Sequence, residues 1–170
     1  AARSAVNAGV DSIEHGSFLT DETLALMKSK GTFLVPTCMA GQWTGGKLER
    51  FPPAVAAKAK AVLAAHDAMM RRAIKSGVKI AFGTDSGVGP HGSNAGEFAL
   101  LVARGMSPAQ ALRTAGPAAA ELLGLADTIG LGNLDIAKLG FPMAPKAWAD
   151  EVLAQIEKKA PVLSAVEGAA

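Results

Sequence analysis

The chain is short of the residues that mark several classes of protein. Cys38 is the one cysteine among 170 residues, so no disulfide can form within the chain, and a reducing, cytoplasmic compartment is expected. Tyrosine is absent and aromatic residues make up only 5%. The formal net charge is +2, and no lysine and arginine cluster with interleaved aromatics occurs, so no nucleic-acid partner is expected. No apolar run is long enough to cross a membrane, and no signal peptide is recognisable.

What the chain does contain is an alternation of helical and strand-like segments. Apolar residues make up 49% and charged residues 19%, which is ordinary for a globular domain with a sizeable core. Glycines, prolines and capping residues divide the chain into these segments. These signals predict helices over residues 1–8, 20–30, 52–76 and 94–104, another from residue 107 onward, and a last one over 117–123. They predict strands over residues 10–15, 32–37 and 78–82, and loops over 41–46 and 83–93.

Helices that connect successive strands imply that the strands run parallel, and hence an α/β fold. Three strands cannot close a barrel, because a (β/α)8 barrel usually needs about 250 residues. We therefore expect either the C-terminal portion of a TIM-like (β/α)8 barrel or a small, complete α/β sandwich. The barrel portion is favoured because the sequence opens within a helix.

The ends of two strand-like segments carry the candidate chemistry. Asp85 lies in the glycine-rich run Phe82–Gly87, directly after the apolar residues of the third segment. A carboxylate at the mouth of a strand is costly to bury unless a metal ion or a catalytic role compensates for it. His15 ends the first strand in the same way. A histidine and an aspartate at two strand ends predict one metal site at one rim of a sheet or barrel.

Three stretches of sequence together resemble the amidohydrolase superfamily. They are Ser12-Ile13-Glu14-His15-Gly16, the run from Gly77 to Asp85, and the loop Pro90-His91-Gly92. Residues 109–125 are also similar to the stretch that follows the last barrel strand in that family. The branch that the chain resembles comprises the imidazolonepropionase-like and Xaa-Pro dipeptidase-like metal-dependent hydrolases, and the similarity covers about residues 1–135.

The resemblance implies a (β/α)8 barrel with a divalent metal, most often zinc, at the C-terminal ends of its strands. His15 would end strand six and bind the metal. Asp85 would end strand eight, bind the metal and take the proton from its water. His91 would contact the substrate or polarise its carbonyl group. The implied activity is hydrolysis of a C–N bond in an amide, a cyclic amide or a dipeptide.

Four further residues are considered for a place at the site. His66 lies inside an alanine-rich helix and is interpreted as a surface or packing residue. Thr37 and Cys38 end the middle strand and are candidates for the lining of the pocket. Trp43 is interpreted either as a wall of the substrate pocket or as an ordinary anchor of its loop.

The chain departs from the family pattern at both ends. The paired histidines of the family's first strand, the lysine of its fourth and the histidine of its fifth have no counterpart here. A zinc site usually takes three or four protein ligands, so with His15 and Asp85 alone the chain is expected to be inactive by itself. We expect a partial barrel over residues 1–128 and a divergent tail, a remnant of the family's small β-sandwich, over residues 129–170.

The expected partners are a small-molecule or dipeptide-like substrate, the missing N-terminal part of the barrel, and further copies of the chain, because exposed strand edges favour association. No membrane partner is expected. Two other functions stay open. One is a non-catalytic α/β scaffold or binding module, in which His15 and Asp85 would be capped separately by backbone groups. The other is a phosphate-binding barrel with residues 83–92 as an anion nest, which the lack of lysine and arginine in that loop disfavours.

Overall fold

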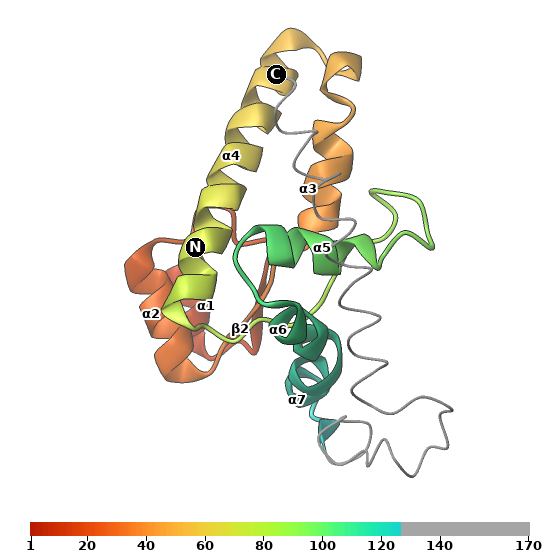
Figure 1. Cartoon of the computed structure of the whole chain (residues 1–170). Coiled ribbons are helices and arrows are strands. Elements are labelled where there is room, and N and C mark those ends of the chain that lie inside the picture. Colours follow the sequence, from red (N-terminus) through yellow and green to blue (C-terminus); the bar gives the residue numbers. More distant parts are fainter. Residues whose placement is uncertain (127–170) are drawn as a thin grey trace, which may run out of the picture. The chain divides into compact units, whose positions relative to one another are not determined.

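The computed structural model of the chain describes residues 1–126, and Figure 1 shows the order of the elements along it. These residues belong to two compact units, of which the first is Ala1–Glu97 and the second begins at Phe98. The predicted tail over residues 129–170 lies outside the described residues. Among residues 1–126, the helices lack the combination of length and apolar character that a membrane span requires.

The first unit is built around a small parallel sheet. β1 (Ser12–Glu14) pairs with β2 (Phe33–Val35) in a register that sets Ile13 opposite Leu34. The third predicted strand joins through one parallel bridge, between Leu34 and Ile80. The predicted α/β class and the parallel direction of the strands are therefore confirmed. The strands are shorter than predicted, and β2 ends at Val35 because Pro36, which follows it, has no N–H to donate to a ladder.

Two short helices precede the paired strands, α1 (Ala2–Ala8) before β1 and α2 (Asp21–Lys30) before β2. The predicted start of α2 is confirmed, since the hydroxyl of Thr20 accepts a hydrogen bond from the backbone N–H of Thr23 at 3.3 Å. The predicted end at Gly31 is confirmed as well, with that glycine in the left-handed conformation at φ 75°. α2 packs against both α1 and α4, with fully buried side chains that help to form the core.

α4 (Pro53–Ser76) is a helix of 24 residues that matches its predicted bounds. Pro53 lies in its first turn, where a missing N–H leaves no hydrogen bond unmade. Met69 and Met70, in the C-terminal half of the helix, are fully buried in the core. The N-terminal half continues beyond the sheet and lies alongside α3 (Cys38–Gly45), as Figure 1 shows.

The prediction of a loop over residues 41–46 is wrong, because most of this segment belongs to α3. A short 3₁₀ turn, η1 (Leu48–Arg50), then leads to α4. The glycines of the segment indicate a loop in the sequence, but they serve packing in the structure. A Cβ atom at Gly41 or at Gly45 would lie 3.2 Å from a methyl carbon of Leu63 on α4. The two glycines therefore allow α3 and α4 to approach closely.

α5 (Gly96–Ala103) begins in the first unit and leads into the second. There α6 (Pro108–Arg113) starts with a reciprocal capping box between Ser107 and Gln110, at the predicted position. A separate helix is predicted from about Pro117. Instead, α6 continues through a π-helical turn, η2 (Thr114–Ala118), into α7 (Ala119–Leu122). The wider turn contains Pro117, whose ring nitrogen cannot donate a helical hydrogen bond.

Candidate functional site

The C-terminal ends of the three parallel segments share an unusual backbone conformation. Among residues 1–126, the non-glycine residues with positive φ are His15, Thr37 and Asp85, at 60°, 52° and 51°. Each of them follows one of the segments that pair in the sheet. The left-handed conformation costs such residues about 1 kcal/mol or more, and strain of this kind is concentrated at functional sites. The edge at which the segments end is therefore the candidate site.

A cavity of about 540 Å³ lies at this edge, a volume suited to a small-molecule ligand. His15 and Asp85, the two predicted metal ligands, both line it. Thr37 lines it as well, as the sequence suggests, whereas Cys38 is buried and does not. The other lining residues come from the neighbouring loops, from α3 and from α4: Ser17, Pro36, Ala40, Gly41, Thr44, Val55, Lys58, Ala59, Val62, Leu63, His66 and Val88.

A chain of hydrogen bonds determines which ring nitrogen of neutral His15 carries the proton. The Nδ1 atom of His15 lies 2.6 Å from Oγ1 of Thr37. The hydroxyl of Thr37 donates its single proton to the carbonyl oxygen of Pro36 at 2.7 Å. Oγ1 must therefore accept from His15, so Nδ1 carries the proton and Nε2 keeps its lone pair. A neutral imidazole nitrogen with a free lone pair is the form that binds a metal ion.

His66 belongs to the same chain of hydrogen bonds, although the sequence gives it only a surface or packing role. It is buried on α4, and its Nε2 donates to the carbonyl oxygen of Pro36 at 2.9 Å. Pro36 thus accepts from both Thr37 and His66. The sequence does place His66 at helical spacing from buried residues such as Met70, and a buried polar group requires a partner, but which partner depends on the fold.

Glu97 is a further residue that sequence reasoning misses. Its side chain is fully buried, and its two carboxylate oxygens accept hydrogen bonds from the backbone N–H groups of Cys38 at 2.9 Å and Met39 at 2.7 Å. These N–H groups belong to the first turn of α3. The side chain of Thr37, the residue at the N-cap position of that helix, makes no capping hydrogen bond. Glu97 therefore fixes the start of the helix that forms one wall of the cavity.

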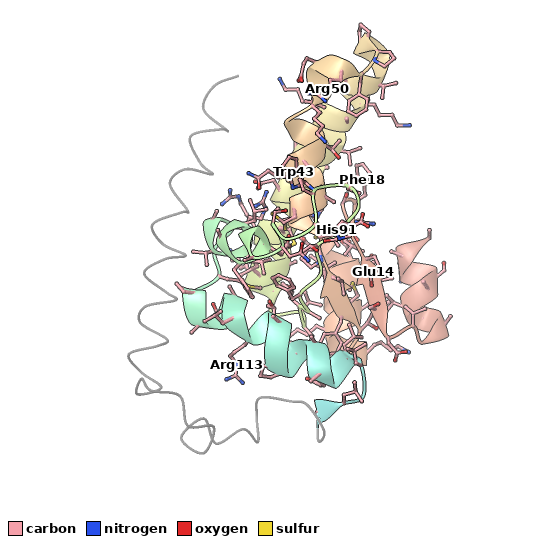
Figure 2. The ribbon with its side chains drawn as sticks, turned by 90° about the vertical axis from the view of Figure 1, so that its right-hand side faces the viewer. Glu14, Phe18, Trp43, Arg50, His91 and Arg113 are labelled. Atoms are coloured by element: carbon pink, nitrogen blue, oxygen red, sulfur yellow. The ribbon has the colours of Figure 1, made fainter. Side chains whose placement is uncertain are left out.

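His91, the predicted substrate-binding residue, is exposed and is not among the residues that line the cavity. It lies in the predicted loop over residues 83–93, which packs against α3. A Cβ atom at Gly89 would collide with the indole ring of Trp43, so that ring lies directly on the backbone of the loop. Figure 2 shows Trp43 close to the loop that carries His91. Trp43 thus anchors this loop and does not line the large cavity.

The cavity brings together two groups of the kind that bind metal ions, the imidazole of His15 and the carboxylate of Asp85. In the described part of the chain, no group of three or more histidine, cysteine, aspartate or glutamate side chains is close enough to hold a metal ion. The arrangement can therefore supply part of a metal centre together with a carboxylate able to accept a proton, beside a largely apolar binding space.

Known proteins are similar to this chain in sequence. The model of the amidohydrolase family matches residues 2–132. An uncharacterized protein of Mycobacterium tuberculosis is 39% identical over 120 residues, which are 65% of this chain and 30% of that protein. Ochratoxinase of Aspergillus niger is 36% identical over 119 residues, which are 66% of this chain and 23% of the enzyme.

Solved structures lead to the same family. A Xaa-Pro dipeptidase with methionine bound in its active site is 42% identical, with a TM-score of 0.72, over 76% of this chain and 32% of that one. The chain thus spans about a third of the length of the mycobacterial protein and of the dipeptidase, and less than a quarter of that of ochratoxinase. Because the family model matches most of the sequence, the predicted membership is confirmed. The chain belongs to the amidohydrolase family of hydrolases.

Proposed function

We propose that this chain is the C-terminal portion of a metal-dependent hydrolase that cleaves the C–N bond of an amide, a cyclic amide or a dipeptide. The observation that supports the proposal is that His15 and Asp85 line one cavity at the C-terminal ends of parallel strands. Active sites of (β/α)8 barrels lie at that end of the strands. In such a barrel, β1, β2 and the segment around Ile80 would be strands six, seven and eight.

The two donor residues suit a divalent metal such as zinc, which binds imidazole nitrogen and carboxylate oxygen. His15 would bind through Nε2, because Thr37 holds the proton on Nδ1. Asp85 would bind through its carboxylate. Two ligands fall short of the three or four that zinc usually takes. We therefore propose that the isolated chain is inactive, and that the other ligands belong to the N-terminal part of a complete barrel.

A bound metal would supply an activated water, because it would lower the pKa of that water towards 7. The Asp85 carboxylate would hold the proton that the attacking water releases and would deliver it to the nitrogen of the leaving amine. Thr37 would keep the imidazole of His15 in one tautomer, because its own hydroxyl proton goes to the carbonyl of Pro36. His91 would contact the substrate from its loop, as the family resemblance implies.

The relatives indicate which amides to try first. A dipeptidase cleaves an amide bond, and the structure of the Xaa-Pro dipeptidase contains an amino acid, methionine, in its active site. Since that protein is 42% identical to this chain over the shared region, we propose Xaa-Pro dipeptides as the first substrates to assay.

The test is a chimeric barrel in which residues 1–126 replace the matching segment of the Xaa-Pro dipeptidase. We expect the purified chimera to bind zinc and to hydrolyse Xaa-Pro dipeptides. Asp85→Asn should lower kcat by about 10²–10⁴-fold, the usual contribution of a general acid–base group. His15→Asn should lower the zinc content. Asp11→Asn is the matched control, because Asp11 is an exposed carboxylate just before β1, at the end of that strand opposite to His15.

Two results would contradict the proposal. Near-normal turnover in the Asp85→Asn chimera would remove Asp85 from the reaction. A chimera that binds zinc and cleaves no amide, while the parent dipeptidase is active in the same assay, would remove amide hydrolysis as the function of this segment.

A further inference from the structure

The cavity that His15 and Asp85 share has a second half of different chemistry. His15, Asp85 and Thr37 lie at the strand ends, where His66 is bonded to Pro36. Away from them, the lining comes from side chains of α4 spaced three or four residues apart, so that one face of the helix borders the cavity over more than two turns. The residues of this apolar half are Val55, Ala59, Val62 and Leu63 of α4 and Ala40 of α3.

One positive charge lies on this half of the cavity. Lys58 is the one lysine or arginine among the lining residues, and Asp85 is the one carboxylate. No salt bridge to Lys58 forms among residues 1–126. Lys58 precedes His66 by about two turns of α4, or about 12 Å along the helix axis. Because His66 is bonded to Pro36 at the strand ends, the cation lies towards the end of the cavity that is remote from them.

We propose that this half of the cavity favours, among the amides that the site cleaves, those that carry in addition an apolar body and a carboxylate distant from the scissile bond. The apolar side chains of α3 and α4 would cover the body, and Lys58 would pair with the carboxylate. Lys58 orients the ligand, because it attracts the carboxylate to the end of the cavity that is remote from the strand ends. The identity of the scissile group as an amide rests on the proposed function.

The test measures binding to the 170-residue chain without metal and without turnover. Octanoate carries an apolar body and a carboxylate, and octanamide is its uncharged counterpart. We expect octanoate to bind about two- to fivefold more tightly, the range of a solvent-accessible ion pair. Lys58→Met should abolish this preference, and added salt should weaken it. Lys60→Met is the matched control, because Lys60 is exposed on the same helix and does not line the cavity.

A second variant tests the location independently of charge. Ala59→Trp would place an indole ring in the apolar half of the cavity, and we expect it to abolish the binding of both probes. The proposal is overturned if neither probe binds the unmodified chain, if the preference for octanoate survives Lys58→Met, or if Ala59→Trp binds as well as the parent. Since no step of this test needs zinc or hydrolysis, its failure is distinguishable from failure of the chimeric barrel to cleave amides.

Discussion

Replacement of Glu97 by alanine should be the most damaging single truncation around the cavity. The carboxylate is fully buried and accepts two hydrogen bonds from the first turn of α3. A buried N–H left without an acceptor costs about 1–3 kcal/mol, so the loss of both acceptors should lower the free energy of unfolding by about 2–6 kcal/mol. Glu97→Gln keeps one acceptor oxygen and should cost roughly half as much.

Urea unfolding provides the assay. The chain has two tryptophans, and Trp43 lies on α3, so a Trp148→Phe background makes fluorescence report on the helix that Glu97 caps. Glu49→Ala is the control, because that side chain is 71% exposed and its removal should change stability by no more than about 0.5 kcal/mol. If Glu97→Ala shifted the transition no further than Glu49→Ala, the assignment of Glu97 as the cap of α3 would be refuted.

Two further predictions concern single protons. Thr37→Val should remove the preference of neutral His15 for the Nδ1–H tautomer, and Thr37→Ser should retain it. Spectra of the ring ¹⁵N nuclei of the three histidines would detect either result. They should be recorded about two pH units above the ordinary histidine pKa of about 6.5, where the rings are neutral. The hydroxyl of Thr20, followed by the backbone N–H of Glu22, holds the pKa of Glu22 below its ordinary value. Glu22 therefore contributes stability above its unfolded-state pKa that is lost as the pH falls through the lower folded-state pKa. In an NMR titration Thr20→Ala should raise the pKa of Glu22, and an unchanged pKa would contradict the role of the Thr20 hydroxyl.

The parts of the fold that sequence predicts well are those whose signals are local. Thr20 and Gly31 bracket α2 because a capping hydroxyl and a left-handed glycine act within one turn of the helix that they end. The positions of His15 and Asp85 on one cavity were also predictable, since parallel strands bring their C-terminal ends to one edge.

The parts that sequence does not predict depend on contacts between distant residues. α3 starts where Glu97, far along the chain, accepts its first N–H groups, and its glycines fit against Leu63 of another helix. Glu97 itself gives no such signal, because a glutamate in the first turn of a helix is already favourable for that helix. His66 is similar, since its partner is a carbonyl group at the end of a strand.

The left-handed residues at the strand ends bear on how this sequence can change over evolution. Glycine adopts that conformation without steric strain, so a glycine at position 37 would relieve the strain of the folded backbone. It would also remove the hydroxyl on which the tautomer of His15 depends. Selection against backbone strain alone would therefore favour glycine at such positions. A lineage that retains threonine, histidine and aspartate there has kept a strained backbone together with the chemistry at the end of the sheet.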